Sequence, residues 1–129
     1  MLNDALATAL SAILNREKIG RKECVIRPSS KTIKAVLEIM NKNNYIGSFD
    51  EVITQKGNFL KVNLLGNINK CGSIKPRYSV KKDRYELFEK RYLPAKDFGI
   101  IFVSTSKGIM THVEARKKGI GGKLIAYCY

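Results

Sequence analysis

The chain has 129 residues, a length that allows one compact domain or two small lobes that share an interface. Apolar residues make up 44% of it, which is enough for a buried core and excludes a disordered chain. The formal net charge of +13 favours a polyanionic partner, either nucleic acid or an acidic membrane. Residues 71–129 hold 13 basic and 5 acidic residues, against 11 and 6 in residues 1–70, so we expect the stronger anion contact in the second half.

Apolar residues at helical spacing predict two helices in the first third of the chain. The first helix is expected over residues 3–15. The second is expected to be capped by Ser29 or Ser30 and to end at the pair Asn43–Asn44, because serine caps helix starts and asparagine tolerates left-handed backbone. Its buried face is predicted to consist of Ile33, Val36, Leu37 and Met40.

Three strands are predicted to complete the first lobe. One is short, at residues 25–26, and the others run over residues 45–53 and 59–65, with a turn at Gly57 between them. The last of these strands alternates apolar and polar side chains, which is typical of a strand with one buried face. The order α-β-α-β-β therefore predicts a self-sufficient lobe over residues 1–67.

The rest of the chain is predicted to be β-rich with short helices. After a connector over residues 66–72, strands are expected over residues 74–81 and 100–103, and the continuous apolar run of the latter indicates burial on both faces. Between these strands, Asp83 is expected to cap a short helix. A last strand is expected over residues 124–129.

A capping box predicts one more short helix near the carboxyl end. Thr111 can accept a hydrogen bond from the amide of Glu114. Three basic residues then complement the negative end of the helix, and Gly119 supplies a left-handed stop. Residues 68–129 therefore form the second lobe, and the chain as a whole is predicted to be an α+β protein of two small lobes.

The three cysteines, Cys24, Cys71 and Cys128, are far apart in the sequence and have apolar or small neighbours. They contain no Cys-x-x-Cys pair, and the single histidine, His112, completes no metal-binding set, so we expect no metal or other cofactor. The thiols are predicted to fill space in the core of a protein from a reducing compartment. Because the amino terminus has no signal-peptide pattern and no apolar run approaches the ~18 residues that span a bilayer, we expect a soluble, cytoplasmic protein.

Motifs for nucleophilic catalysis are incomplete. A serine nucleophile elbow needs Gly-x-Ser-x-Gly, but Ser104 stands where the first glycine belongs before Ser106. A Ser/His/Asp set is possible only through His112, for which a solvated position in the capping box is the simpler interpretation. A peripheral membrane protein is a further alternative, and a basic amphipathic helix with a large apolar face, which it would need, is missing from the sequence.

One enzyme alternative stays open. The run from Arg116 through Gly119 to Gly121 is similar to the Arg-x-x-Gly-x-Gly pyrophosphate loop of acetyl-coenzyme A-dependent N-acetyltransferases. That loop follows a strand and opens a long helix in those enzymes, whereas here it follows a predicted helix and precedes the last strand. We therefore expect a glycine-rich helix end and not an enzyme.

Three adjacent hydroxyl residues, Ser104, Thr105 and Ser106, directly follow the buried strand, and Lys107 and Gly108 come next. Short side chains let the backbone approach a partner closely, and each hydroxyl both donates and accepts, which suits a ribose 2′-hydroxyl, a phosphate or a base edge. The lysine adds charge and the glycine removes bulk. The pattern favours contact with RNA, and a polar turn with capping hydroxyls is the alternative.

The whole carboxyl-terminal motif resembles the universal small-subunit ribosomal protein S8 family. The matching segments are Ser104-Thr-Ser-Lys-Gly-Ile-Met-Thr, Glu114-Ala-Arg and Gly119-Ile-Gly-Gly, followed by a short apolar strand. Segments nearer the amino terminus are also similar to the family, namely Asn3-Asp-Ala-Leu-Ala, Arg27-Pro-Ser-Ser-Lys and Asn44-Tyr-Ile. Three more resemble its archaeal and eukaryotic branch, namely Ile68-Asn-Lys-Cys-Gly, Ile74-Lys-Pro-Arg-Tyr and Tyr92-Leu-Pro-Ala.

The resemblance implies a structural protein of the small ribosomal subunit, with two α+β lobes and neither catalysis nor cofactor. It implies primary binding to the central domain of small-subunit ribosomal RNA, neighbouring ribosomal proteins as partners, and a role in platform assembly and translation. It implies no membrane and no small-molecule substrate. On the matched motif, the residues expected to contact RNA are Ser104, Thr105, Ser106 and Gly108, with support from Gly121 and Gly122. The basic residues expected to add charge contacts with RNA are Lys107, Arg116, Lys117 and Lys118.

Overall fold

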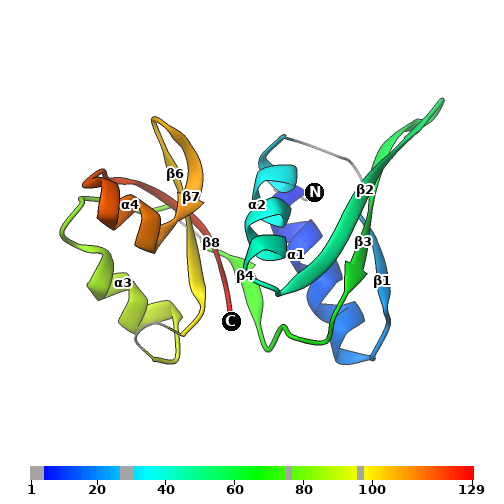
Figure 1. Ribbon diagram of the computed structural model, residues 1–129, viewed down its shortest axis with the longest axis horizontal. Helices are drawn as coiled ribbons and strands as arrows, with labels where there is room; N and C mark the ends of the chain where they lie inside the picture. The colour runs from blue at the N-terminus through cyan, green and yellow to red at the C-terminus, as the bar shows by residue number, and fades with distance from the viewer. Residues whose placement is uncertain (1–4, 27–30, 75–76, 96–97) are drawn as a thin grey trace. The chain divides into compact units, whose positions relative to one another are not determined.

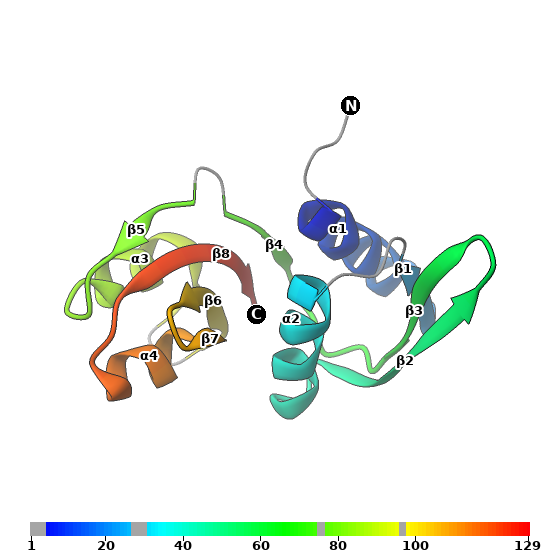
Figure 2. The ribbon, with the colours of Figure 1, turned by 90° about the horizontal axis from the view of Figure 1, so that it is seen from above.

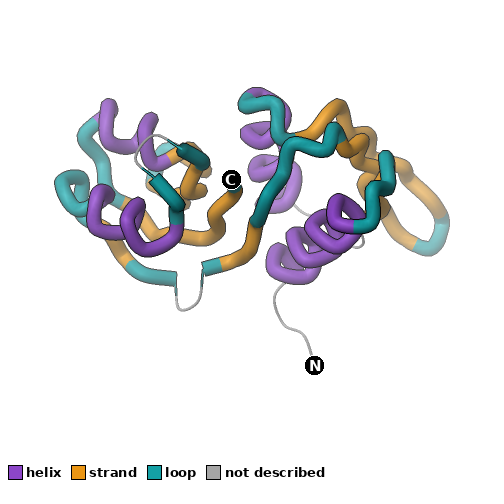
Figure 3. Tube along the Cα trace, turned by 90° about the horizontal axis from the view of Figure 1, so that it is seen from below, coloured by secondary structure: helices purple, strands orange, loops and turns teal. Residues whose placement is uncertain are grey.

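The computed structural model describes residues 5–26, 31–74, 77–95 and 98–129. The chain divides into two compact units, Met1–Asn69 and Lys70–Tyr129. Both units contain helices and strands (Figure 3), so the fold is α+β, as the sequence predicts. The expected helix cap at Ser29 or Ser30 lies outside the described residues.

The first unit is a three-stranded antiparallel sheet with two helices on the same side of it (Figure 1, Figure 2). Its elements are α1 (Ala5–Lys18), β1 (Glu23–Ile26), α2 (Lys31–Lys42), β2 (Ile46–Thr54) and β3 (Gly57–Leu64), and the strand order is β1-β3-β2. Helix α1 continues to Lys18, beyond its expected end at residue 15, and the chain turns only at Gly20, whose φ is 75°. The unit therefore has the predicted order α-β-α-β-β.

Local patterns in this unit are confirmed. The four residues expected on the inner face of α2 are all buried, namely Ile33, Val36, Leu37 and Met40. After the helix, Asn44 adopts a left-handed φ of 62°, and the amide of Tyr45 donates to the carbonyl of Met40 at 2.9 Å. In β3, apolar residues are buried and polar ones exposed in alternation, as a strand with one covered face requires.

The second unit is a five-stranded antiparallel sheet with two short helices. Its elements are β4 (Cys71–Ser73), β5 (Ser79–Val80), α3 (Tyr85–Tyr92), β6 (Ile100–Thr105), β7 (Gly108–Thr111), α4 (His112–Lys118) and β8 (Gly122–Cys128). Strand β8 is central, because β4 and β5 pair with successive parts of one edge and β6 pairs with the other edge, with β7 beyond it.

Four expectations about this unit are wrong. Of the described residues in the span 74–81, where one strand was expected, Ser79–Val80 form a strand, while Ile74 and Tyr78 make single backbone hydrogen bonds to β8. Cys71–Ser73 forms a strand where a connector was expected, because β8 takes two short partners along one edge. Helix α3 is not capped by Asp83; its cap position is Arg84, which makes no side-chain capping bond. Strand β8 begins at Gly122, ahead of the expected start at residue 124.

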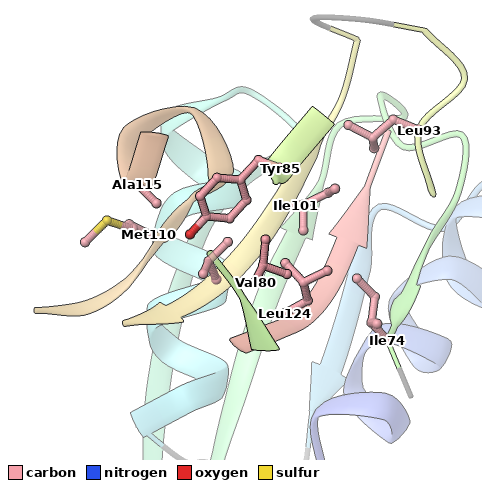
Figure 4. Packing of buried hydrophobic residues seen from close by; sticks show 9 residues of the cluster. Ile74, Val80, Tyr85, Leu93, Ile101, Met110, Ala115 and Leu124 are labelled. Atoms are coloured by element: carbon pink, nitrogen blue, oxygen red, sulfur yellow. The ribbon is translucent and has the colours of Figure 1, made fainter. Parts of the chain in front are cut away.

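Helices α3 and α4 pack against one face of this sheet, and Figure 4 shows side chains of the core that they share with it. The cluster consists of Ile74, Val80, Tyr85, Leu93, Ile101, Val103, Met110, Ala115 and Leu124. The hydroxyl of Tyr85 donates to the carbonyl of Ile120 at 3.0 Å, and burial raises the pKa of this tyrosine. The expected burial of strand β6 is also confirmed, since Ile100, Ile101, Phe102 and Val103 are all buried.

Helix α4 begins and ends at the capping residues that the sequence predicts. Thr111 Oγ1 accepts from the amide of Glu114 at 3.2 Å. Gly119 ends the helix in the left-handed region, with φ 67° and ψ 35°.

Replacing Thr111 by valine keeps the buried shape and removes the capping oxygen. We expect Thr111→Val to lower the free energy of unfolding by about 1 kcal/mol, measured by urea denaturation of the full chain. Thr111→Ser keeps the oxygen and serves as the control, which should recover most of that loss. A larger loss in Thr111→Ser than in Thr111→Val would mean that the methyl group, and not the cap, stabilises this helix.

Candidate nucleic-acid interface

The hydroxyl segment forms the end of a hairpin and not an open loop. Ser104 and Thr105 remain in strand β6, and only Ser106 and Lys107 form the turn before β7 begins at Gly108. Gly108 has a φ of 111°, which favours glycine. All five residues are exposed except Thr105, which is half-buried, so the hairpin tip presents the polar groups expected from the sequence.

The Thr105 hydroxyl is used inside the turn. It donates to the carbonyl of Gly108 at 2.7 Å and accepts from the amide of Lys107 at 3.2 Å. The structure therefore separates the three expected hydroxyls. Thr105 fixes the turn, whereas within the described part of the chain the Ser104 and Ser106 hydroxyls make no hydrogen bond.

A row of polar side chains crosses the sheet beside this hairpin. Lys123 of β8 lies directly opposite Ser104 of β6 on one side and opposite Ser79 of β5 on the other. Side chains that are directly opposite in antiparallel strands share a face of the sheet, with Cβ atoms about 4.5–5.5 Å apart. We call Ser79, Lys123 and Ser104 the serine–lysine row.

The serine–lysine row lies on the sheet face away from α3 and α4. The next residue along β8, Leu124, belongs to the core cluster, as do Val80 after Ser79 and Val103 before Ser104. Since successive side chains in a strand point to opposite faces, the row points away from that core. All three of its residues are exposed, and among the described residues none of the three side chains has a hydrogen bond or an ion pair.

Sequence reasoning missed Lys123 and Ser79. The available signal in the sequence was the polar residue Lys123 directly before the apolar residue Leu124, which continues the alternation of a strand. The expected strand started at residue 124 and therefore left the lysine out. Nothing in the sequence indicates that Ser79, on a strand of two residues, pairs beside it.

The two glycines before Lys123 allow the backbones to come close. A Cβ on Gly122 would lie 2.5 Å from the carbonyl oxygen of Ser104 and 2.8 Å from Val103 Cγ1. A Cβ on Gly121 would collide with the carbonyl oxygen of Val80. Both glycines are therefore required by the packing of β8 between β5 and β6, and this packing positions the serine–lysine row.

The basic residues at the end of α4 differ in whether they form an ion pair. Arg116 Nη1 lies 3.3 Å from Glu89 Oε1 and 4.0 Å from Glu86 Oε1, so this guanidinium is paired within the unit. Lys117 and Lys118 are exposed, and neither has an ion pair among the described residues. They lie on a helix that covers the core face of the sheet, and so they are not part of the serine–lysine row.

The expected solvated position of His112 is wrong. Its side chain is only 1% exposed, because the first residue of α4 faces the sheet. Nδ1 accepts from the backbone amide of Ile101 at 3.1 Å, which leaves the proton of a neutral ring on Nε2. Nε2 lies 3.4 Å from Glu89 Oε1, so Glu89 approaches both His112 and Arg116.

The geometry also contradicts the acetyltransferase interpretation. The run from Arg116 to Gly121 ends helix α4 and leads into strand β8, whereas the pyrophosphate loop opens a helix. The amides of Gly119 and Ile120 donate to the carbonyls of Arg116 and Ala115, at 3.1 and 3.0 Å. They are therefore already used by the helix end and cannot hold a diphosphate.

The described residues form neither a metal site nor a membrane-spanning helix. In the described ranges no group of three or more His, Cys, Asp or Glu side chains could hold a metal ion. Within the same ranges no helix is long and apolar enough to cross a membrane.

The different roles of Arg116 and Lys117 can be separated by stability. We expect Arg116→Met to lower the free energy of unfolding by about 1–2 kcal/mol, because it removes a cation from the buried carboxylate of Glu89. Lys117→Met, one residue along the same helix, should change it by less than about 0.5 kcal/mol. The measurement is urea denaturation. If the two variants were equally stable, the ion pair to Glu89 would have no structural role.

Residues 4–129 match the family model described as Ribosomal protein S8. Members of this family are structural proteins of the small ribosomal subunit in the cytoplasm, where they bind ribosomal RNA and neighbouring ribosomal proteins and take part in translation. Because the match extends over nearly the whole chain and the α+β fold agrees with it, the chain belongs to the ribosomal protein S8 family.

Proposed function

We propose that this chain binds the central domain of small-subunit ribosomal RNA through its second unit, and that it thereby supports assembly of the subunit platform. We also propose that it belongs to the archaeal and eukaryotic branch of the family, on the three segments that resemble that branch. The observation that carries the proposed RNA contact is the exposed serine–lysine row beside the hairpin tip, where hydroxyls and a lysine lie together on one face of the sheet.

The proposed direct contacts come from side chains that have no internal partner in the described part of the chain. They are Ser104, Ser106 and Lys107 on the hairpin, Lys117 and Lys118 at the end of α4, and Ser79 and Lys123 in the row. Gly108 lets the RNA backbone approach the turn. Thr105, Gly121 and Gly122 take part mainly by shaping the surface, and Arg116 contributes charge while held by Glu89.

Two physical effects contribute to the proposed binding of RNA. Lysines neutralise phosphates and release counterions, which gives affinity that falls as salt rises. Serine hydroxyls are short and both donate and accept, so they suit the 2′-hydroxyls and base edges of the wide, shallow minor groove of folded RNA. A lysine between two serines combines both effects within one cross-strand row.

The two effects predict different responses to mutation, measured as the dissociation constant of the full chain for a central-domain RNA fragment over a series of salt concentrations. With about five phosphates neutralised, the log–log slope should be near −4. Lys123→Met should reduce the magnitude of the slope by about one, as expected for a single phosphate contact. Ser104→Ala with Ser106→Ala should weaken binding by about tenfold and leave the slope unchanged.

Lys90→Met is the matched control, since Lys90 is an exposed lysine of the same unit that lies on helix α3 and is not among the proposed contacts. It should leave both affinity and slope close to those of the unmodified chain. Equal effects of Lys90→Met and Lys123→Met would contradict the proposed surface. Equal affinity for the central-domain fragment and for an unrelated RNA duplex of the same length would contradict the proposed target.

A further inference from the structure

Strands β4 and β8 place two of the three cysteines opposite one another. Cys71 pairs with Cys128 in the antiparallel register. In the adjacent pair, Lys70 and Tyr129 exchange both backbone hydrogen bonds, at 2.9 and 2.8 Å. Because hydrogen-bonded and non-hydrogen-bonded pairs alternate along an antiparallel ladder, the two cysteines form a non-hydrogen-bonded pair.

A non-hydrogen-bonded pair has the dimensions of a disulfide. Its Cα atoms are about 4.5 Å apart, and its side chains are closer together than in the other kind of pair. Disulfides span Cα separations of roughly 4.4–6.8 Å. Two cysteines directly opposite one another also point to the same face of the sheet, so both thiols lie on one side of the ladder.

Both residues are buried thiols in the structure. We expect reagents to reach them through local opening, because β4 is a strand of three residues at the edge of its sheet. Short edge strands open locally at a small part of the cost of global unfolding. The pair is thus protected in the closed sheet and exposed in brief openings of β4.

We propose that Cys71 and Cys128 form a redox-active pair, which a small-molecule disulfide such as oxidised glutathione converts into an intramolecular disulfide. One protein thiolate attacks the glutathione disulfide and releases one glutathione thiolate. The second protein thiolate then attacks the resulting mixed disulfide and releases the other. Two protein thiols are oxidised, one oxidised glutathione is reduced to two glutathiones, and the two thiol protons pass to the released glutathiones or to water.

The cross-link would join the end of the central strand to the beginning of the second unit. It would enclose residues 71–128, almost the whole of that unit, in one covalent ring. Such a long ring restricts the unfolded chain strongly, so the oxidised form should resist unfolding. The proposal rests on the strand register and does not depend on the RNA surface.

The third cysteine is an internal control. Cys24 lies in the first unit, where its partner across the ladder is Val62 and not a cysteine. Burial raises the pKa of the Cys24 thiol, and the positive charge of Arg16 opposes this shift in part. Cys24 is therefore expected to stay a thiol when the pair is oxidised.

The test equilibrates the folded full chain with mixtures of reduced and oxidised glutathione, quenches with acid, and alkylates in denaturant. Mass spectrometry then counts the alkylated cysteines and maps the linked peptides. The three alkylatable thiols of the chain should fall to one. The linked peptides should contain Cys71 and Cys128, and the equilibrium constant for closure should be at least about tenfold higher in the folded chain than in urea.

Two variants make the result decisive. Cys24→Ser should form the same disulfide to the same extent, and Cys128→Ser should form no intramolecular disulfide. Three alkylatable thiols at every glutathione ratio would overturn the proposal. So would a mixture of pairings that includes Cys24, or a closure constant that is the same in buffer and in urea.

Discussion

The register of strand β8 is the constraint on which the second unit depends. Because Lys123 lies opposite Ser104 and Ser79, Leu124 points into the core and the lysine points out. A slip of one residue would exchange the two faces, bury the lysine and expose the leucine. Gly121 and Gly122 help to hold this register, since a side chain at either position would collide with the neighbouring backbone. The same register sets Cys128 opposite Cys71 at the far end of the strand.

Local sequence patterns predicted the parts of the fold that local interactions decide. The buried stripe of α2, the alternation of β3 and the capping of α4 by Thr111 and Gly119 each depend on a few consecutive residues, and each is confirmed. The elements that the sequence did not predict correctly depend mostly on pairing between strands that are far apart in the chain. The short strands β4 and β5 exist because β8 offers them an edge, and neither has a strong pattern of its own.

In the candidate site, too, local sequence predicted the residues of one segment, and long-range strand pairing placed the others beside it. The hairpin residues from Ser104 to Gly108 form a contiguous motif, so the sequence could single them out. Lys123 and Ser79 become neighbours only through pairing across three strands, and no spacing along the chain indicates this. The sequence also could not show that the Thr105 hydroxyl is used inside the turn, or that Arg116 is paired to Glu89.

The basic residues of the second unit therefore fall into two groups, those paired within the unit and those exposed on its surface. Arg116 belongs to the first group, because its guanidinium contacts the carboxylate of Glu89. The same carboxylate also approaches the buried ring of His112. Such a polar group inside the unit is stable only while its members remain paired. The second group lies on the surface, where Lys107, Lys117 and Lys123 are free of ion pairs among the described residues. Net charge predicts attraction to RNA, but only the structure distinguishes the cations that are paired within the unit from those that are exposed.

Protection of individual lysines on RNA binding tests the central claim most directly. The full chain is acetylated briefly, alone and in complex with central-domain ribosomal RNA, and the reactivity of each lysine is read by mass spectrometry. The proposed surface predicts that Lys123 and Lys107 lose reactivity in the complex, while Lys90 on helix α3 stays reactive. Protection of Lys90 with Lys123 still reactive would contradict the account, because the RNA would then contact helix α3 and not the serine–lysine row.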